Sequence, residues 1–357
     1  MNIALVVDDF HGGAGNIVQL LATELSKEHN VSMIMTNLHS DKRYALEDIA
    51  VYDENISIMG KNKLVGLLSA MGKMRKLIKR IKADVVISFI DNNNSLVCLS
   101  MLGCKTPVVV SERSNPLVIF PKAPWDKIRR IAYRRANIVT VQFNDFSSFD
   151  GNRFSEKCHV TSNIVEKPLY FKENYDTDTV RFVTVGRLQG IKRMDLMIEL
   201  FDMAHKENPD IELHIFGDGP QKGDLNKLIK QKGLENKVFL RGYCNEVHKT
   251  LAEFDVYLMT SLQEGFPNSL CEAMAVGLPS VSIACHKGVE ELGKFGEYGF
   301  TAPEGDKKEF VRKMLMLASD VQLRSQMGSG ARSISETYSK EKIMGQWRDC
   351  IREAMEK

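Results

Sequence analysis

The chain has 357 residues, 43% of them hydrophobic, and a formal net charge of +2. This balance excludes binding to polyanions through overall charge, and the length suffices for two domains of ordinary size. The seven cysteines are scattered without metal-like spacing, which fits a reducing cytosol and argues against zinc. We expect no signal peptide, because Met1 leads directly into a predicted strand without a basic flank and a small-residue cleavage site. We expect no membrane-spanning helix, because no apolar run approaches roughly 18 residues.

The chain opens with a Rossmann-like pattern. Residues 2–7 are predicted as a buried strand, DDFHGGAG as a turn, NIVQLLATELSKE as a helix and VSMIMT as a second strand. Gly12, Gly13 and Gly15 do not complete a G-x-G-x-x-G, so the dinucleotide-binding fingerprint is weak. A tight turn without side-chain bulk and a close approach to phosphate are about equally good interpretations.

Residues 61–82 carry eight lysines and arginines and no acid, with Leu, Met and Ile spaced for one helical face. A basic amphipathic helix is typical of contact with an anionic membrane surface, although a solvated helix packed on the sheet is commoner. The complete absence of acids, and a second basic segment at residues 127–135, favour an anionic partner. The cations expected to contact that partner are Lys73, Arg75, Lys76, Lys79 and Arg80.

Two strands of the N-terminal half are predicted to end in polar residues, at the edge where parallel sheets carry function. ADVVISFIDNNN ends one strand at Asp91, and TPVVVSERSNP ends another at residues 111–116. Asp91 could instead cap a helix that begins at Asn93 or Asn94. For Glu112, an ion pair with a neighbouring arginine and a role in binding a ligand are about equally good interpretations.

The Rossmann pattern restarts after a polar boundary. ANIVTVQF is predicted as a strand, CHVTSNIVEKP as the crossing between domains, and KENYDTDT as the boundary itself. Asp176 and Asp178 form a D-x-D before a strand, which we interpret as a solvated turn. In RFVTVGRLQGIKRMD, Asp195 is a plausible helix N-cap, and Arg187 and Lys192 flank a glycine loop that could hold a diphosphate.

Glu264 and Glu272 flank a predicted loop-to-helix junction. FDVYLMTS is predicted as a strand, SLCEAMAVG as a helix and LPSVSIA as the next strand, so the loop lies at the carboxyl end of a parallel sheet. Free backbone N–H groups at residues 268–270 would favour phosphate, and Glu272 could accept hydrogen bonds from ribose hydroxyls. Spacing alone fits a solvated Glu264, and a Glu272 that merely complements the helix dipole, at least as well.

EGFPNSLCEAMAVGLPSV resembles the donor-site signature of retaining nucleotide-sugar glycosyltransferases of family 4, which have the GT-B fold. The match covers both glutamates, the Gly-Phe-Pro after the first and the Glu-Ala-Met-Ala at the second. SFIDNNN and TPVVVSERSN resemble segments of bacterial enzymes that add N-acetylgalactosamine to undecaprenyl-diphosphate-linked sugars, with Arg113 where histidine is usual. Histidine can exchange a proton near neutral pH, whereas arginine is a fixed donor.

The resemblance implies a role for each matching residue. Glu264 and the backbone after it would contact the donor sugar and phosphates, Glu272 the ribose, and Arg187 and Lys192 the leaving diphosphate. The N-terminal Gly-Gly would let its domain close over the diphosphate. The implied catalytic residues are Arg187, Lys192, Glu264 and Arg113. The implied donor-binding residues are Gly12, Gly13, Phe266, Pro267, Asn268, Ser269, Leu270, Glu272 and Arg241, and Asp91 and Glu112 join the helix cations in binding acceptor.

The resemblance therefore implies an α/β, GT-B protein with two Rossmann-like domains facing across a cleft. Residues 1–165 would bind the acceptor, and residues 166–340 would bind the nucleotide sugar. In such proteins the last helix, here 341–357, often crosses back onto the N-terminal domain. The expected activity is retaining transfer of a hexose or N-acetylhexosamine, with N-acetylgalactosamine as best guess, from a UDP-sugar to a polyisoprenyl-diphosphate-linked glycan. It would serve bacterial polysaccharide or glycan assembly.

We expect no cofactor, no metal and no nucleic acid partner. The expected location is the cytoplasm, peripheral on the inner face of the plasma membrane, in contact with an anionic membrane surface. Three alternatives are a UDP-sugar 2-epimerase, a non-catalytic nucleotide-binding partner of another glycosyltransferase, and a peripheral membrane scaffold without chemistry.

Overall fold

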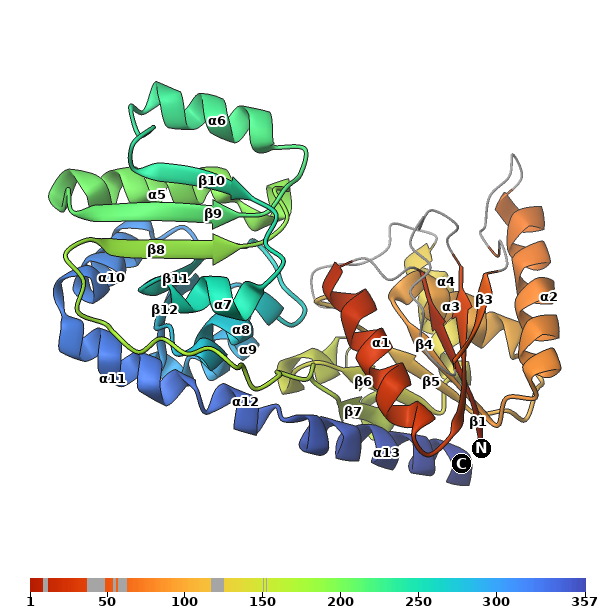
Figure 1. Ribbon diagram of the computed structural model, residues 1–357. Helices are drawn as coiled ribbons and strands as arrows, with labels where there is room; N and C mark the ends of the chain where they lie inside the picture. The colour runs from red at the N-terminus through yellow and green to blue at the C-terminus, as the bar shows by residue number, and fades with distance from the viewer. Residues whose placement is uncertain are drawn as a thin grey trace. The chain divides into compact units, whose positions relative to one another are not determined.

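The structure, a computed structural model, describes residues 1–8, 12–36, 49–53, 56, 63–116, 125–149, 151 and 153–357 (Figure 1). These residues form two compact units. The first consists of Met1–Asn163 and Glu341–Lys357, and the second of Ile164–Lys340. Each unit is built on a sheet whose strands all run parallel, so the predicted Rossmann-like pattern is present twice.

The first unit holds a seven-stranded sheet in the order β3-β2-β1-β4-β5-β6-β7. The central strands are covered on both faces, which is why they appear in the sequence as near-continuous apolar runs. The strands are β1 (Asn2–Val7), β2 (Asn30–Met35), β3 (Ala50–Asp53), β4 (Val85–Phe89), β5 (Val108–Ser111), β6 (Ile138–Val141) and β7 (Cys158–Val160).

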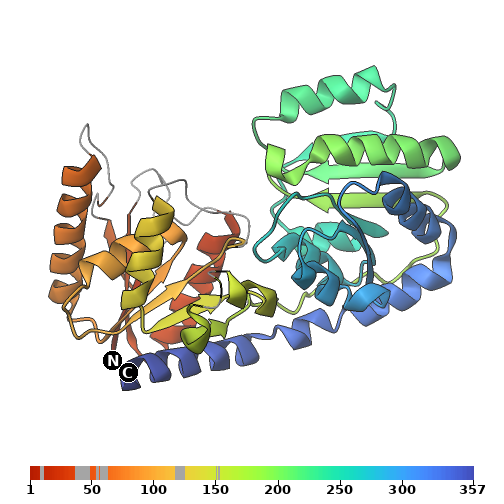
Figure 2. The same cartoon turned by 180° about the vertical axis from the view of Figure 1, so that it is seen from behind.

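Helices cover both faces of this sheet (Figures 1 and 2). The connection from β1 to β2 runs in the opposite direction across the sheet to those leading from β3 through β6, so right-handed crossovers place α1 on one face and α2, α3 and α4 on the other. Helix α3 contacts both α2 and α4. The elements are α1 (Gly12–Ser26), α2 (Lys63–Ile81), α3 (Asp91–Ser100), α4 (Trp125–Ala132) and the 3-10 turns η1 (Tyr133–Arg135), η2 (Asn144–Ser148) and η3 (Ser155–Lys157).

The last helix, α13 (Lys340–Glu356), belongs to the first unit, although the chain before it belongs to the second. Trp347 is fully buried, with its ring centre 5.8 Å from that of Phe89 on β4. At the helix surface, Arg348 pairs with Glu28 at 2.6 Å. The C-terminal helix therefore supplies part of the core of the N-terminal unit.

The second unit holds a six-stranded sheet in the order β10-β9-β8-β11-β12-β13. Its core lies between the strands and the apolar faces of α5 and α10. The strands are β8 (Val180–Val185), β9 (Ile211–Phe216), β10 (Val238–Gly242), β11 (Val256–Met259), β12 (Ser280–Ile283) and β13 (Gly299–Ala302). The helical elements are η4 (Gly190–Lys192), α5 (Met194–Glu207), α6 (Lys222–Gln231), α7 (Val247–Ala252), α8 (Asn268–Val276), α9 (Lys287–Leu292), η5 (Lys294–Gly296), α10 (Lys307–Ser319), α11 (Val321–Ala331) and α12 (Ile334–Thr337).

Two predicted helix starts were wrong. Strand β4 ends at Phe89 and α3 begins at Asp91 itself, so Asp91 does not cap a helix that starts at Asn93 or Asn94. Asp195 lies in the first turn of α5, because the turn η4 leads directly into the helix and Arg193, with φ 51°, occupies the cap position. In both places the chain enters the helix earlier than side-chain capping preferences suggested.

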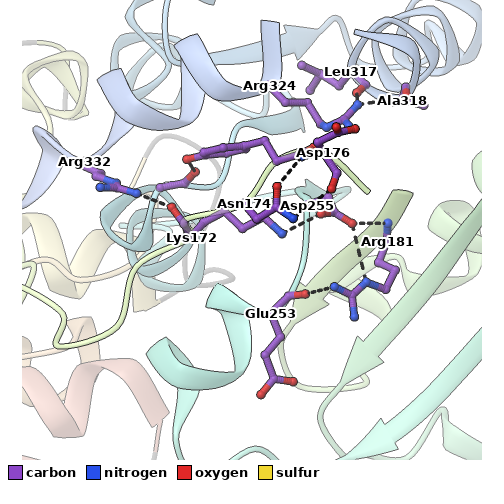
Figure 3. Close-up of polar contacts among 12 residues, drawn as sticks. Lys172, Asn174, Asp176, Arg181, Glu253, Asp255, Leu317, Ala318, Arg324 and Arg332 are labelled. Carbon is purple, nitrogen blue, oxygen red and sulfur yellow. Dashed lines mark hydrogen bonds and ion pairs between the residues drawn. The ribbon is translucent and has the colours of Figure 1, made fainter. Parts of the chain in front are cut away.

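A buried polar cluster fixes the segment before β8 to the second unit (Figure 3). Lys172 Nζ lies 2.7 Å from Asp255 Oδ1, and the two side chains are 5% and 0% exposed. Asp255 Oδ2 accepts a 2.7 Å hydrogen bond from the backbone N–H of Arg181. Arg324, also buried, donates to the Tyr175 carbonyl at 2.8 Å. The carboxylate of Asp255 thus joins the linker segment to the amino ends of β8 and β11.

The D-x-D sequence belongs to the same segment. The side chain of Asn174 donates to the Asp176 carbonyl and accepts from the Asp176 amide, both at 3.0 Å. This local pairing is typical of an Asx turn. Among the described residues, no group of three or more His, Cys, Asp or Glu side chains is arranged to hold a metal ion.

Replacing Asp255 by alanine should cost about 3–5 kcal/mol of unfolding free energy, because Lys172 would stay buried without its partner. Denaturant unfolding measures this loss. The matched control is Glu199→Ala, which breaks a 2.7 Å pair with Lys307 whose members are 43% and 49% exposed. That change should cost less than about 1 kcal/mol, and equal losses would contradict the role assigned to Asp255.

Candidate functional site

The loops after β8 to β12 all emerge at one edge of the second sheet, because its strands are parallel. The loop after β8 is braced by the turn after β9: the Gly186 amide donates to the Phe216 carbonyl and the Leu188 amide to the Asp218 carbonyl, both at 2.9 Å. A Cβ atom at Gly217, where φ is 142°, would lie 1.9 Å from the Gly186 carbonyl oxygen. Glycine is therefore required for the contact that holds this loop.

Lys192 and Glu264, 72 residues apart, meet at this edge. Lys192 Nζ lies 2.6 Å from Glu264 Oε1, with side chains 25% and 11% exposed. Their loops are joined by a 3.1 Å bond from Thr260 Oγ1 to the Lys192 carbonyl and a 2.9 Å bond from the Leu262 amide to the Ile191 carbonyl. An anion that reached Lys192 would compete with Glu264 and release its carboxylate to accept other hydrogen bonds.

Arg187 extends from the same braced loop. Its side chain is exposed, two residues beyond the end of β8. The methylene chain of Lys192 passes close to Gly186: its Cδ and Cε atoms lie 3.9 Å from the position that a Cβ there would occupy. One planar guanidinium and one ammonium group are thus carried by a single loop, an arrangement suited to a diphosphate.

The start of α8 differs in part from expectation. The amide of Asn268 is not free, because it donates to the Phe266 carbonyl at 2.9 Å. Ser269 and Leu270 follow in the first helical turn, where backbone N–H groups lack intrahelical acceptors. Pro267 occupies the cap position ahead of them. Two of the three expected amides therefore remain available for an anion.

Two side chains support this loop. Phe266 is 5% exposed, and its ring packs edge-on against Tyr338 with centroids 5.2 Å apart. Ser269 Oγ accepts a 2.8 Å hydrogen bond from the Tyr257 hydroxyl. The Phe266 ring thus anchors the loop to the body of the unit, and the Ser269 hydroxyl, which accepts from Tyr257, keeps its own proton to donate.

Glu272 lies in the second turn of α8, as predicted. Burial, with a smaller contribution from Glu166, raises the pKa of Glu272 to about 7. A carboxyl group with this pKa is about half ionised near neutral pH. Its capacity to accept two hydrogen bonds from a diol therefore changes within the physiological range.

The sequence reading missed two residues of this edge, Cys285 and His286, which follow β12. The thiol of Cys285 lies against the backbone of Glu264, and burial raises its pKa to about 12. Burial lowers the pKa of His286 to about 4, so the imidazole is neutral at pH 7. The available signal was positional, because Cys285 and His286 lie two and three residues beyond the end of β12, the strand next to β11.

Arg241 does not join these groups through its side chain. Its Nε donates to His214 Nδ1 at 3.0 Å, and its guanidinium lies 4.7 Å from the ring centre of Phe239. These contacts hold the side chain against β9 and β10.

In the first unit, Arg113 is a buried anchor. It is 8% exposed, and its Nε, Nη1 and Nη2 donate to Ser111 Oγ at 2.7 Å, the Thr161 carbonyl at 2.7 Å and Thr161 Oγ1 at 3.0 Å. Its guanidinium lies 5.2 Å from the ring centre of Trp347, and burial lowers its pKa to about 9. This geometry favours a positioning role between β5, the segment after β7 and α13.

Glu112 is also buried, which favours the ion-pair interpretation. Its Oε1 accepts a short hydrogen bond from the Tyr133 hydroxyl and lies 3.8 Å from Arg129 Nη1. Burial raises the pKa of Glu112, while Arg129 and Tyr133 act against that rise. Asp91, in contrast, is partly exposed at the start of α3 and lines a small groove with Trp125.

A polar cluster at the same edge of the first sheet was missed. Asp8 Oδ1 accepts from Thr36 Oγ1 at 2.9 Å and from Asn93 Nδ2 at 2.8 Å. Asp8 follows β1, Thr36 follows β2 and Asn93 lies in the first turn of α3. These positions are far apart in the sequence, and the parallel direction of the strands brings them together at one edge of the sheet. Gly12 and Gly13 begin α1, and the turn before them, residues 9–11, lies outside the described residues.

The α2 cations do not gather at this edge. Helix α2 returns from the carboxyl end of β3 to the amino end of β4, so Lys79 and Arg80 lie at the opposite edge of the sheet. At 1.5 Å per residue, Arg80 is about 24 Å along the helix from Leu64. Lys73 and Lys76 are exposed between them, and Arg75 donates to the Leu102 carbonyl at 3.0 Å.

Comparison with known proteins gives a consistent assignment. Residues 166–334 match the family described as "Glycosyl transferases group 1". An uncharacterised glycosyltransferase of Haemophilus influenzae is 32% identical over 84% of this chain and 86% of its own. An alpha-1,4-N-acetyl-D-galactosaminyltransferase of Campylobacter jejuni, named for a diNAcBac-PP-undecaprenol-linked acceptor, is 24% identical over 99% of both chains.

The fold is likewise shared with a solved protein. The crystal structure of Anabaena HepE in complex with UDP superposes with a TM-score of 0.82 at 18% identity, covering 99% of this chain and 100% of that one. The expected GT-B architecture of two Rossmann-like units is therefore confirmed. Among the described residues, no helix is long and apolar enough to cross a bilayer.

Glu272 should make stability depend on pH. Its folded pKa of about 7 exceeds the ordinary 4.5, so its stabilising contribution is complete below about pH 4.5 and is lost as pH rises through 7. Relative to Glu272→Gln, which does not titrate, the wild type should lose about 1–3 kcal/mol between pH 5 and pH 8. Unfolding free energies measured at both pH values test this, with the exposed Glu235→Gln as control. A difference between wild type and Glu272→Gln that stays constant with pH would contradict the assignment.

Proposed function

Because the chain belongs to the group 1 glycosyltransferases, we propose that it moves a hexose or N-acetylhexosamine from a UDP-sugar to a hydroxyl of a lipid-linked glycan, with retention of anomeric configuration. The observation that carries this proposal is the Lys192–Glu264 pair, at the same edge of the second sheet as Arg187 and the start of α8. N-acetylgalactosamine is the favoured sugar because the C. jejuni relative is named for transferring it.

The main catalytic demand is the departure of UDP, since negative charge develops on the diphosphate as the sugar becomes oxocarbenium-like. Lys192 would supply a point charge and Arg187 a planar fork, while the Ser269 and Leu270 amides add the positive end of α8. A diphosphate oxygen would replace Glu264 as the partner of Lys192. The released carboxylate would then accept hydrogen bonds from the sugar, and no metal is needed in this scheme.

Glu272 would hold the ribose hydroxyls, which favours binding of UDP above the pKa of about 7. His286, neutral at pH 7 and next to the residue that contacts Glu264, would complete the sugar pocket with a donor or acceptor that does not change charge. Near neutral pH the charge of Glu272 would therefore change with pH, whereas that of His286 would not.

Retention brings the acceptor hydroxyl to the face of the sugar from which UDP leaves. The bond between the anomeric carbon and the diphosphate oxygen breaks, the acceptor oxygen bonds to that carbon, and the departing diphosphate oxygen takes the acceptor's proton. No protein base is required. Arg113, with three donor nitrogens bonded within its own unit, would position the end of β5 and take no direct part in proton transfer.

The acceptor would be a polyisoprenyl-diphosphate-linked glycan in bacterial glycan assembly, by analogy with the named acceptor of the C. jejuni relative. Helix α2 supports work at an anionic membrane surface. Its first turns expose Leu64, Val65 and Leu68, and its later turns carry the basic cluster. Exposed apolar and cationic side chains on one helix are typical of helices at a membrane interface.

The first test is binding of UDP, GDP and a panel of UDP-sugars, measured by thermal shift. UDP should stabilise the wild type, and Glu272→Ala should lose most of that shift. With UDP-N-acetylgalactosamine and a lipid-linked acceptor, Lys192→Met should lower turnover at least about 100-fold, since it removes charge from the leaving group. The exposed Lys230→Met on α6 is the matched control.

Two outcomes would overturn the proposal. One is the absence of any shift with UDP, and the other is full turnover by Lys192→Met. Proton NMR of the product identifies the new anomeric configuration, and inversion would remove the retaining mechanism. Formation of a 2-epimer without added acceptor would instead support an epimerase.

A further inference from the structure

Besides the cations of α2, the first unit has a cationic hollow beside α4 and η1. A hollow of about 480 Å³ is lined by Lys127, Arg130, Ile131, Arg134, Arg153 and Phe154. Among the described residues that line it, four of the six are cations and none carries a carboxylate. This hollow is distinct from the small groove that Asp91 lines with Trp125. That groove involves Trp125 and Ile128, which lie on a different face of α4.

The wall of this hollow is a helical stripe. Three residues of the wall, Arg130, Ile131 and Arg134, lie three, four and seven positions after Lys127. This is the spacing of one helix face through α4 and η1. In the middle of the stripe Ile131 is 61% exposed. An isoleucine flanked by cations on an open surface has no partner in the described core, and it suits the boundary between headgroups and acyl chains.

The floor and the rim are built from the segment before β7. Phe154 is buried, with its ring centre 6.1 Å from those of both Tyr133 and Phe149. Behind it, Lys157 Nζ donates to the carbonyls of Tyr133 and Ala136 at 2.8 and 2.7 Å. This packing fixes the end of η1 against the floor, so the cations of the wall are carried on a rigid frame.

From this geometry we infer that the hollow binds the phosphate headgroup of an anionic phospholipid, with Ile131 entering the acyl boundary. This inference rests on the proposed function only in that the acceptor is carried by a lipid. A free phosphate ion could bind the cations of the hollow, but it has no apolar part that Ile131 could contact. The hollow shares its side of the first sheet with α2, whose exposed Leu64, Val65 and Leu68 suit the same interface.

The test uses the full chain in vesicle co-sedimentation, with phosphatidylcholine alone or mixed with phosphatidylglycerol. The wild type should bind only the anionic vesicles. Arg134→Glu/Arg153→Glu should weaken that binding at least about twentyfold, because each cation near an anionic surface contributes roughly fivefold. Ile131→Ser should also weaken it, by about threefold or more. The control Lys227→Glu/Lys230→Glu changes net charge equally on α6 and should stay within about twofold.

Three results would overturn the inference: no binding of wild type to anionic vesicles, equal loss in the α6 control, or complete displacement by excess inorganic diphosphate with Ile131→Ser unaffected. The last would identify a soluble phosphate site. The UDP thermal shift is measured on the same samples and should be unchanged in Arg134→Glu/Arg153→Glu. If UDP gives no shift while vesicle binding depends on Arg134 and Arg153, the proposed transferase function fails and the headgroup site stands.

Discussion

The parallel direction of every strand is the constraint on which the candidate sites depend. In each unit all strands end at one edge, so residues far apart in sequence converge there without any long loop. Lys192 after β8, Glu264 after β11 and Cys285 after β12 meet in this way, as do Asp8, Thr36 and Asn93 in the first unit. The same constraint sends the returning helices to the opposite edge, which separates the end of α2 from those sites.

The donor-site charges are balanced within the unit before any ligand binds. Lys192 and Glu264 neutralise each other, and the raised pKa of Glu272 leaves that carboxyl partly protonated near pH 7. A bound nucleotide sugar would exchange these internal contacts for contacts with its own diphosphate and hydroxyls. Binding strength therefore depends on the difference between two sets of polar contacts, and both sets use the same side chains.

Strands and the two glutamates could be predicted from the sequence because their signals are local. Buried parallel strands are continuous apolar runs, and EGFPNSLCE sets Glu264 and Glu272 on a loop and a helix by spacing. The direction of a side chain at a strand end is not local. Glu112 and Arg113 follow β5 as predicted, yet both turn inward, because Tyr133, Thr161 and Trp347 arrive from distant segments to pair with them.

The return of α13 to the first unit affects how this protein can be divided. Trp347 fills the core beside Phe89, so a fragment that stopped at Asn163 would leave a large cavity and expose the partners of Arg113. Neither unit is a simple N- or C-terminal half. A chimaera that borrowed the donor unit of a relative would have to replace an internal block with two junctions, near positions 163 and 340, and keep the native last helix.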